Sequence, residues 1–482
     1  MKLFELLKDV CVLEWNADPD LEIPNVAYDS RKVTAGDLFV AVSGFASDGN
    51  RFIPMAMEKG AAVVVTAKKP EQPVPYVLVE NDRLALALIG CNFFRHPARD
   101  MILIGVTGTN GKTSVTWLLK QLLETVTGCK AGLIGTMENR IGDLVIPTER
   151  TTPESFELQS LFAQMRDAGC RYAIMEVSSH AIALDRVGGV HFDVAAFTNL
   201  TEDHLDFHKT MEHYCDTKAE LFKRCDAAVM NRDDEWFPRL SSGSDCPRIT
   251  VSTKENAGIQ AKNVTLLSDG IRYTAISDSN TLEVRVPIPG RFTVYNSLTV
   301  LAIAKALGID LNKAVAALAN VQGVKGRIEV VPTPGKPYTV LIDYAHTPDG
   351  LDNVLRSVRD FCKGRLISVF GCGGDRDPIK RPIMGRIGVE LSDLAVITSD
   401  NPRTEDPDAI IRDIVAGVDS SMGAYKIITD RRKAIEYAMD IGEKDDIILL
   451  AGKGHETYQE INGVKHHLDE REEVAAYLQK RG

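Results

Sequence analysis

The chain has no CxxC pair, and its nine cysteines are scattered over 482 residues. An odd number of cysteines without metal-ligand spacing argues against a zinc site or a disulfide framework, and a reducing cytosol fits best. No apolar run approaches the roughly 18 residues of a membrane span. Internal repeats and low-complexity tails are also missing. These absences favour a cytoplasmic globular protein.

Basic residues are fewer than acidic residues: the chain has 56 Lys and Arg and 67 Asp and Glu, which gives a formal net charge of −11. A chain this acidic is a poor candidate for a broad phosphate-facing surface, so we expect no nucleic-acid partner. Apolar residues make up 44% and charged residues 26%, which is typical of a globular protein. At roughly 150 residues per domain, the length predicts about three domains.

Strand and helix patterns alternate, which predicts an α/β fold of three domains. We expect a smaller N-terminal α/β substrate domain over 1–98, a central P-loop ATPase-like parallel sheet over 99–328, and a C-terminal Rossmann-like domain over 329–482. Residues 1–15 predict an amphipathic helix and no signal peptide. Residues 241–290 predict an antiparallel insertion. The expected strands are Asp37–Val42, Ala61–Thr66, Tyr76–Val79, Met101–Val106, Tyr172–Val177, Val194–Thr198, Ala227–Met230, Thr339–Ile342, Leu366–Phe370, Leu394–Thr398, Ile427–Thr429 and Ile447–Leu450.

The sharpest motif is Gly-Val-Thr-Gly-Thr-Asn-Gly-Lys-Thr at residues 105–113, between an expected strand and an expected helix. Backbone N–H groups of such a loop wrap phosphate oxygens, and the helix N-terminus adds partial positive charge. Lys112 can reach the β- and γ-phosphates, and the Thr113 hydroxyl can ligate Mg²⁺. Val106 occupies the first glycine position of the usual P-loop pattern. The alternative is a structural glycine turn between strand and helix.

Acidic and imidazole groups follow the next two expected strands. Glu176 ends one strand, and a carboxylate there, beside a P-loop, is well placed for Mg²⁺. The alternative is a solvated strand end. The stretch 198–208, which contains His204, follows the other strand and favours a polar site by its composition. Lys218 lies in a segment that reads, on composition, as an ordinary amphipathic helix.

The stretch Thr-Gly-Thr-Asn-Gly-Lys-Thr-Ser resembles the phosphate loop of the Mur ligase family, the ATP-dependent ligases of peptidoglycan synthesis, with folylpolyglutamate synthetase as a cousin. The resemblance implies ATP as substrate and two Mg²⁺ ions. Lys218 matches a family lysine that CO₂ converts to a carbamate, in a Tyr-x-x-x-Lys-x-x-Leu-Phe setting. The implied catalytic residues are Lys112, Lys218, Glu176 and His204. The implied metal ligands are Thr113, Glu176, His204 and Lys218 as its carbamate.

The resemblance also assigns nucleotide contacts. In the C-terminal part, Thr293 replaces the first asparagine of the family pattern Gly-x-Phe-Asn-x-x-Asn, so only Asn296 carries over. Arg327 lies at the expected domain junction, where an arginine can fold over the phosphates. The implied ATP-binding residues are Gly108, Thr109, Asn110, Gly111, Lys112, Thr113, Ser114, Asn296, Arg327 and His346.

The N-terminal motifs Asp-Ser-Arg at 29–31 and Gly-Phe-Ala-Ser-Asp-Gly at 44–49 resemble the UDP-sugar-binding domain of two branches of the family, MurE and MurF. In isolation, Asp-Ser-Arg is only a turn. Leu184 stands where the family often has a glutamine that binds the substrate. The residues implied for a UDP-N-acetylmuramoyl dipeptide are Ser30, Phe45, Ala46, Ser47, Thr151, Thr152, Ser178 and Arg186.

Three loops follow successive C-terminal strands, at 371–377, 400–403 and 452–456, and such loops converge at one edge of an open α/β sheet. Taken alone, Asp-Asn-Pro-Arg at 400–403 is an Asn-Pro turn before a helix with Asp406 as N-cap. In the family it is the signature of the branch that adds meso-diaminopimelate, with Arg403 gripping the distal carboxylate. The residues implied for meso-diaminopimelate are Arg376, Asp400, Asn401, Pro402, Arg403, Gly452 and Glu456.

The implied reaction adds meso-diaminopimelate to the D-glutamyl carboxylate of UDP-N-acetylmuramoyl-L-alanyl-D-glutamate through an acyl phosphate, in a cytoplasmic monomer. The alternatives are the same reaction with L-lysine, addition of D-Ala-D-Ala as in MurF, and folylpolyglutamate synthesis. MurF should lack Asp-Asn-Pro-Arg, and folylpolyglutamate synthetase should lack the Asp-Ser-Arg block. A nucleotide-gated binding protein with a degenerate site is a rival of another class. It should bind ATP without amino-acid-dependent release of ADP.

Overall fold

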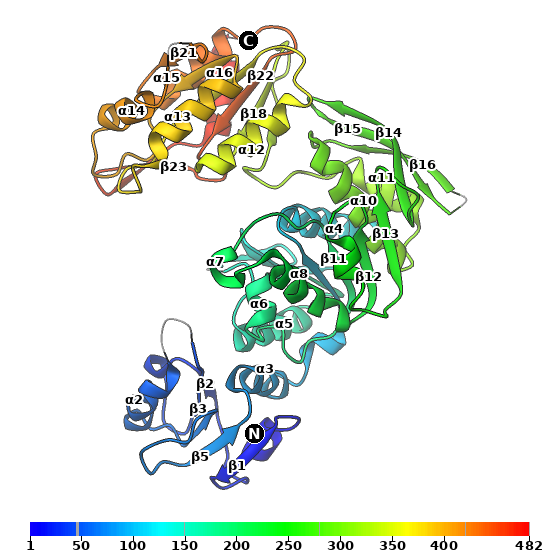
Figure 1. Ribbon diagram of the computed structural model, residues 1–482, viewed down its shortest axis with the longest axis vertical. Helices are drawn as coiled ribbons and strands as arrows, with labels where there is room; N and C mark the ends of the chain where they lie inside the picture. The colour runs from blue at the N-terminus through cyan, green and yellow to red at the C-terminus, as the bar shows by residue number, and fades with distance from the viewer. Residues whose placement is uncertain (45–47, 149, 279, 420, 482) are drawn as a thin grey trace. The chain divides into compact units, whose positions relative to one another are not determined.

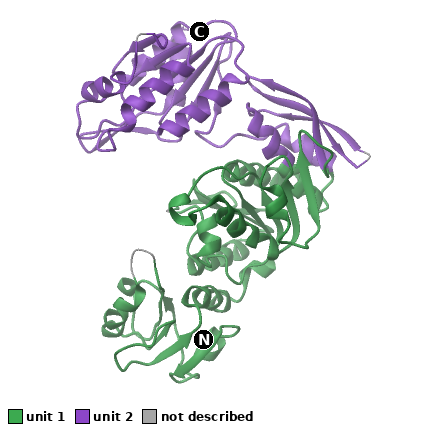
Figure 2. Cartoon of the chain, viewed as in Figure 1, with its two compact units in different colours: residues 1–258, 299–310 green, residues 259–298, 311–482 purple. Residues whose placement is uncertain are grey.

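A computed structural model describes residues 1–44, 48–148, 150–278, 280–419 and 421–481. The chain forms two compact units, residues 1–258 with 299–310 and residues 259–298 with 311–482 (Figure 2). The boundary between them passes through helix α10 (Arg291–Ala306). Both units alternate strands with helices, so the predicted α/β class is confirmed. The division into three domains at residues 98 and 328 stays a prediction.

The first sheet of unit 1 has the order β1-β5-β4-β3-β2, and all of its pairs are parallel except β1 with β5. Its strands are buried on both faces: Val63 and Val65 of β4 lie in one apolar core and Val64 in another. That explains why the sequence shows continuous apolar runs there. The elements are α1 (Leu3–Leu6), β1 (Val12–Asn16), β2 (Val26–Ala27), η1 (Ser30–Lys32), β3 (Leu38–Ala41), η2 (Gly49–Phe52), α2 (Ile53–Glu58), β4 (Val63–Thr66), β5 (Tyr76–Val79), α3 (Asp82–Phe93) and η3 (Pro97–Asp100).

The expected N-terminal helix over residues 1–15 is wrong. Only one turn, α1, forms, and Asp9 has a positive φ of 66° that no continuing helix adopts. Residues 12–16 form strand β1 instead, and Trp15 lies opposite Val77 of β5. A segment with β-branched and aromatic side chains fits a pleated edge, and pairing with a neighbouring strand overrides a weak helical period.

The second sheet of unit 1 runs in the order β13-β12-β11-β6-β10-β7-β8-β9, parallel from β13 to β7 and antiparallel beyond. The expected strands are confirmed, with ends displaced by one or two residues, whereas β7, β8 and β9 were not expected. The elements are β6 (Ile102–Thr107), α4 (Lys112–Thr127), β7 (Ala131–Ile134), β8 (Asn139–Ile141), β9 (Leu144–Ile146), α5 (Ser155–Asp167), β10 (Tyr172–Glu176), α6 (Ser179–Ala183), β11 (Phe192–Phe197), α7 (Leu205–His208), α8 (Met211–Ala219), η4 (Glu220–Lys223), β12 (Cys225–Asn231), α9 (Phe237–Ser241) and β13 (Arg248–Ser252).

Unit 2 begins with the antiparallel strands β14 (Ile259–Leu267), β15 (Gly270–Ser277) and β16 (Asn280–Val286), which confirms the second part of the expected antiparallel insertion. Its first part is wrong, because β13 pairs parallel with β12. The main sheet of unit 2 has the order β17-β18-β22-β19-β20-β21 and is parallel apart from β17. Helices α12, α13 and α14 cover one face, and α15 and α16 the other (Figure 1). The remaining elements are α11 (Leu311–Leu318), β17 (Glu329–Val331), β18 (Thr339–Asp343), α12 (Pro348–Arg359), β19 (Leu366–Phe370), α13 (Lys380–Leu391), β20 (Leu394–Ile397), α14 (Pro407–Val415), β21 (Tyr425–Ile427), α15 (Arg431–Asp440), β22 (Ile447–Ala451), β23 (Tyr458–Ile461), β24 (Val464–His467) and α16 (Glu470–Arg481).

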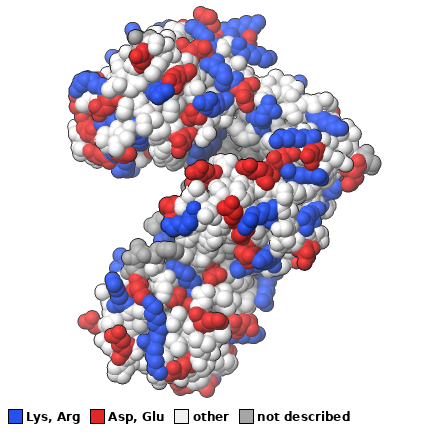
Figure 3. Space-filling view, viewed as in Figure 1, with Lys and Arg blue, Asp and Glu red and all other residues white. Residues whose placement is uncertain are grey.

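Charge is mixed on the surface. On the face drawn in Figure 3, acidic and basic side chains alternate over both units, and neither sign covers a unit by itself. Such a surface lacks the one-sided basic field of a nucleic-acid footprint on this face. Within the described part of the chain, no helix is both long enough and apolar enough to cross a membrane.

Candidate active site

The parallel strands of unit 1 end almost in register. Glu176, the last residue of β10, lies opposite Val106 of β6, and Phe197, the last residue of β11, lies opposite Thr107. The loops that follow these strands therefore leave the sheet at one edge, where α/β proteins place their ligands. Each loop carries one of the motifs singled out in the sequence.

Two features of the phosphate loop require glycine at position 108. Gly108 has a φ of 143°, and a Cβ there would lie 2.0 Å from the Thr198 hydroxyl oxygen. The loop is also fixed from the next strand, because Asn110 N donates to Asn199 Oδ1 at 3.0 Å and Thr109 N donates to Asn199 O at 2.8 Å. Gly111 caps helix α4, so the helix N-terminus opens directly onto the loop. This geometry suits a phosphate group.

Two lysines share one acceptor in this loop. Lys112 Nζ donates to Gly108 O at 2.9 Å and to Thr109 O at 2.8 Å, and Lys218 Nζ donates to the same Gly108 O at 3.0 Å. Lys218 is 1% exposed and lies 4.6 Å from the centre of the Tyr214 ring. Burial lowers the pKa of Lys112, and burial with the charge of Lys112 lowers the pKa of Lys218 well below its usual value. The Lys218 amine is therefore prone to be neutral, which is the form that reacts with CO₂.

Glu176 is the polar centre of the site. Its buried carboxylate accepts hydrogen bonds from Thr113 Oγ1 at 3.0 Å, from Thr136 N at 2.9 Å and from Thr136 Oγ1 at 3.0 Å. A Cβ on Gly135 would lie 2.4 Å from Glu176 Oε1, so glycine is required there. The adjacent hydroxyl and carboxylate oxygens of Thr113 and Glu176 are hard donors that suit Mg²⁺. Thr136 was missed, because it follows β7, a strand that the sequence did not mark.

His204 lies beside the same aromatic ring as Lys218. Its φ is 55°, its side chain is 47% exposed, and its ring meets those of His180 and Tyr214 edge-on, with centroids 4.8 and 6.3 Å away. Over the described residues, no group of three or more His, Cys, Asp and Glu is arranged to hold a metal. The predicted ligand set also includes a hydroxyl and a modified lysine, which such a group would not contain. Its role in binding Mg²⁺ stays a prediction.

The residues predicted to bind the dipeptide surround the end of β10. Thr152 Oγ1 donates to Glu176 O at 2.9 Å, and Ser178 N donates to Thr152 Oγ1 at 3.1 Å. Arg186 Nη1 donates to Thr152 O at 3.2 Å. The Thr151 hydroxyl lies 3.0 Å from that of Thr136. The structure therefore brings Thr151, Thr152, Ser178 and Arg186 together beside Glu176.

The N-terminal motif is a capped turn, as its isolated sequence suggests. Asp29 accepts a hydrogen bond from Arg31 N at 3.0 Å and caps η1. Ser30 is buried, and its hydroxyl lies 3.4 Å from Met55 Sδ. Phe45, Ala46 and Ser47 lie outside the described residues. The proposed contact of Ser30 with the uridine diphosphate stays a prediction.

Two contacts that the sequence does not mark connect the elements around the first sheet of unit 1 to those around the second. Glu154 Oε2 lies 3.8 Å from Arg83 Nη1 and 3.4 Å from Arg186 Nε. Tyr28 donates a hydrogen bond to Glu157, and burial raises the pKa of Tyr28. No periodic pattern marks these residues, since each falls on an ordinary turn or helix surface until the sheets meet.

The nucleotide contacts predicted in unit 2 have mixed surroundings. Asn296 is buried on α10, and Thr293 Oγ1 donates to Pro289 O at 3.1 Å. Arg327 is exposed, with its guanidinium carbon 5.9 Å from the centre of the Tyr344 ring. His346 is exposed as well, and its Nδ1 donates to Tyr344 O at 2.8 Å. Their roles with a nucleotide stay predictions.

The loops predicted to bind diaminopimelate also leave one sheet edge. Asp343 of β18 lies opposite Ala451 of β22, and Phe370 of β19 opposite Ile397 of β20. Asp406 caps α14 through Asp408 N, as the sequence indicated. A Cβ on Gly452 would lie 2.7 Å from Asp400 Oδ2, so the third loop approaches the second closely.

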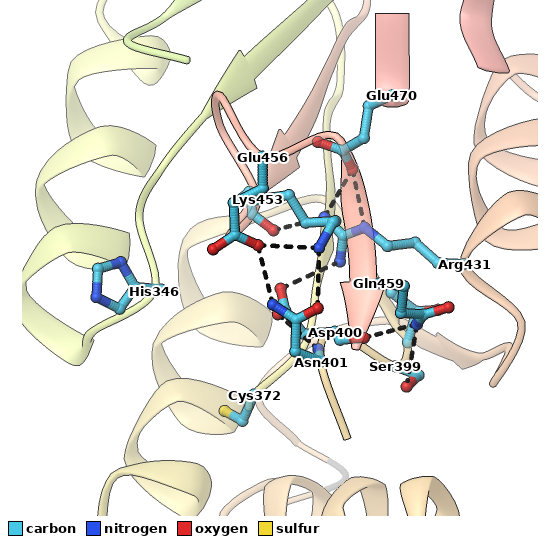
Figure 4. A network of polar contacts seen from close by, with 12 residues as sticks. His346, Cys372, Ser399, Asp400, Asn401, Arg431, Lys453, Glu456, Gln459 and Glu470 are labelled. Carbon is cyan, nitrogen blue, oxygen red and sulfur yellow. Dashed lines mark hydrogen bonds and ion pairs between the residues drawn. The ribbon is translucent and has the colours of Figure 1, made fainter. Parts of the chain in front are cut away.

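Asn401 and Glu456 are joined directly. Asn401 Nδ2 donates to Glu456 Oε2 at 2.9 Å, and Lys453 Nζ lies within hydrogen-bonding distance of both residues (Figure 4). Asp400 Oδ1 accepts from Asn401 N at 2.7 Å. Arg431 Nη1 lies 3.9 Å from Asp400 Oδ2. The two buried cations, Lys453 and Arg431, were not singled out in the sequence.

Arg403 adopts a φ of 51°, and it is held on both sides. Its Nη1 donates to Gly374 O at 2.7 Å, and its Nε lies 3.4 Å from Glu460 Oε2. The hairpin β23–β24, which was not expected, fixes its backbone, because Arg403 N donates to Glu460 O and Asn462 N donates to Arg403 O. Arg376 is exposed, with Nη1 donating to Asp375 O at 3.2 Å. The guanidinium of Arg403 thus faces a backbone carbonyl and a carboxylate, and its role with an amino acid stays a prediction.

Most of the chain matches models of one known family of enzymes. Three family models cover the chain: the catalytic domain of the Mur ligase family over 22–87, the Mur ligase middle domain over 106–304, and the Mur ligase glutamate ligase domain over 326–454. The chain belongs to the Mur ligase family.

Full-length relatives narrow the similarity further. The chain is 47% identical to a UDP-N-acetylmuramoyl-L-alanyl-D-glutamate–2,6-diaminopimelate ligase of Clostridium tetani, with 100% of each sequence covered. It is 45% identical to the ligase of the same name from Clostridioides difficile, again over 100% of both. A solved structure with that name is 30% identical, covers 100% of this chain and 99% of the other, and gives a TM-score of 0.79.

One histidine near the site sets a pH dependence of stability. His208 is 1% exposed, its Nε2 lies 2.9 Å from Ser179 Oγ, and burial lowers its pKa to about 4. Between pH 6.5 and 4 the unfolded chain binds a proton at this ring that the folded chain refuses. Stability therefore falls as the pH falls through this window, by about 3 kcal/mol at pH 4.

Replacing His208 tests this linkage. We expect His208→Phe to lose less unfolding free energy than the wild type between pH 6.5 and 4.5. The measurement is urea unfolding at both pH values, with His191→Phe, an exposed histidine, as control. Parallel losses in the wild type and in His208→Phe would contradict the assignment.

Proposed function

We propose that this enzyme adds meso-2,6-diaminopimelate to the D-glutamyl γ-carboxylate of UDP-N-acetylmuramoyl-L-alanyl-D-glutamate, with conversion of ATP to ADP and phosphate. The observation that carries the proposal is similarity over the entire chain to relatives that bear the name of this activity. The Asp-Asn-Pro-Arg loop supports the choice of amino acid, because it carries the Arg403 guanidinium and the Asp400 carboxylate and contacts Glu456 through Asn401.

The residues of unit 1 activate the carboxylate. The loop at Gly108 and the N-terminus of α4 bind the ATP phosphates, and the Lys112 ammonium neutralises negative charge on the transferred phosphoryl group. An oxygen of the γ-carboxylate attacks the γ-phosphorus, the bond to the β-phosphate oxygen breaks, and ADP leaves. Thr152, Ser178 and Arg186 hold the dipeptide so that its carboxylate is aligned for attack.

The second half of the reaction uses the amino acid. Its neutral amine attacks the acyl carbon, the bond to phosphate breaks, and the amine loses a proton as the amide forms. Asp400, Glu456 and Arg403 bind the far end of the molecule, where both diaminopimelate and lysine carry an ammonium group and only diaminopimelate carries a carboxylate. A fork of two hydrogen bonds from Arg403 suits that carboxylate.

The donors present fit the two Mg²⁺ ions and the carbamate that we propose. Thr113 and Glu176 would hold one ion, and Lys218 with His204 would complete the second site. When bound, Mg²⁺ would neutralise the negative charge that shifts onto the leaving ADP. The Lys218 amine reacts with CO₂ to give a carbamate and a proton, and its depressed pKa favours this reaction.

An amino-acid panel tests the function. We expect ADP release in the presence of ATP, Mg²⁺ and UDP-N-acetylmuramoyl-L-alanyl-D-glutamate to depend on meso-diaminopimelate, with L-lysine and D-Ala-D-Ala far weaker. Preference for L-lysine would sink the specificity, and ATP binding without turnover by any amino acid would favour a binding protein instead.

Lys218→Ala tests the carbamate. We expect turnover to be lost, because the site loses its acidic ligand, and formate to restore part of it by occupying the vacated space. The control is Lys223→Ala, an exposed lysine paired with Glu220. A ¹³C-labelled CO₂ adduct should appear by NMR in the wild type and be absent in Lys218→Ala. An alanine variant with nearly full activity would refute the metal role.

Arg403→Ala tests the amino-acid pocket. Removing one partner of a desolvated charge pair costs roughly 2–5 kcal/mol, so kcat/KM for meso-diaminopimelate should fall about 30- to 5000-fold. Arg403→Lys should recover only part of this, because an ammonium lacks the fork. Arg412→Ala, an exposed arginine on α14, is the control. Unaltered diaminopimelate kinetics in Arg403→Ala would show that the residue is misassigned.

A further inference from the structure

The pocket in unit 2 contains a lysine with no contact to solvent. Lys453 follows β22 in the third loop and is 0% exposed. Its ammonium donates to Asn401 Oδ1 at 3.2 Å and to Glu456 Oε2 at 3.1 Å, and both partners belong to the proposed amino-acid site (Figure 4). Burying an ammonium is expensive unless its partners are fixed. A lysine retained here therefore calls for a role in the site.

Lys453 determines how Asn401 is oriented. Asn401 Oδ1 accepts from Lys453 and from Glu460 N at 2.9 Å, so both of its acceptor positions face donors. The amide nitrogen must then point at Glu456, to which it donates at 2.9 Å. Exchanging the amide oxygen and nitrogen would set an N–H against the ammonium. Lys453 thus removes the ambiguity of a freely rotating amide.

The same lysine fixes the carboxylate. Both hydrogen bonds on the Glu456 side chain fall on Oε2, and among the described residues no donor reaches Oε1. Around the two buried cations, Arg431 and Lys453, lie three carboxylates, Asp400, Glu456 and Glu470, a formal excess of one negative charge. Within the described chain, Asp400 Oδ2 has no hydrogen-bond donor. An incoming ammonium group would supply the missing charge and donors.

The other buried cation has a different task. Arg431 donates through Nε to Glu470 at 2.8 Å and through Nη2 to Ala451 O at 2.8 Å. Glu470 begins α16, and Ala451 ends β22, so these contacts hold the scaffold together. The Lys453 ammonium, by contrast, donates to no backbone group among the described residues, and both of its partners are side chains of the proposed amino-acid site.

From these contacts we infer that Lys453 is a positioning residue for the amino-acid substrate: it holds Glu456 and Asn401 in the arrangement that receives an ammonium group. The inference rests on the proposed function for the identity of the amino acid. It does not require Lys453 to touch the substrate. Asn401 in turn donates to Glu456, so both contacts of Lys453 converge on this carboxylate, and that dependence can be measured.

A double-mutant cycle provides the test, with Lys453→Met, Glu456→Gln and the double variant. We expect Lys453→Met to raise the KM for meso-diaminopimelate about 10- to 100-fold, with kcat and the KM for ATP changed less than about 3-fold, because binding is lost equally in ground and transition states. In the Glu456→Gln background the same substitution should change KM by less than about 3-fold. Equal effects in both backgrounds would overturn the inference.

Lys465→Met is the matched control, because Lys465 also lies over the Tyr458 ring, at 4.1 Å, yet is exposed and contacts no predicted pocket residue. It should behave as wild type, and a comparable KM change there would overturn the inference. Should Lys453→Met fail to fold, Lys453→Gln is compared in both backgrounds. The amino-acid panel with wild type judges the proposed function separately. Whichever amino acid it accepts, a KM for that amino acid that is unaffected by loss of Lys453 refutes the positioning role.

Discussion

Parallel strands that end side by side determine where the polar groups of this protein lie. In unit 1, Thr107 and Glu176 occupy neighbouring strand ends, and in unit 2 the same holds for Asp343 and Ala451. A shift of two residues in any of these pairings would move a loop by about 6.6 Å, beyond the reach of its hydrogen bonds. The hydrophobic strands therefore do more than form the core, since their register aligns the chemistry at the sheet edge.

Glycine lets the loops approach one another once the register is set. Gly108, Gly135 and Gly452 each lie where a Cβ would come within 2.0–2.7 Å of a side-chain oxygen on another loop. Those oxygens belong to Thr198, Glu176 and Asp400. A larger residue would push apart the groups that the strands bring together. The sequence places Gly108 and Gly452 in loop motifs and does not mark Gly135, whereas the structure shows that each of the three makes room for a specific polar atom.

The sequence predicted the architecture well where its signal was local. A buried parallel strand followed by a glycine-rich loop is recognisable by itself, and so is Asp406 before Pro407. The N-terminal error arose because β1 is defined by its partner β5, which lies some sixty residues away. Thr136 escaped because strand β7 before it was not marked, whereas the hairpin β23–β24 has a local signal, the Asn462-Gly463 turn between its strands, that was overlooked. Lys453 lies within a recognised motif, but the sequence does not show that its ammonium is fully buried. That burial depends on how the surrounding loops pack in the structure.

The contrast between two buried lysines shows why residue type alone does not assign a role. Lys218 and Lys453 are 1% and 0% exposed. Lys218 donates to a carbonyl oxygen that Lys112 also uses, and burial together with the charge of Lys112 lowers the pKa of Lys218. Lys453 faces the full charge of Glu456. A carbamate at Lys453 would place a second negative charge against that carboxylate, whereas at Lys218 it would meet the cation of Lys112. Electrostatics thus favour the proposed carbamate at Lys218 and a retained ammonium at Lys453.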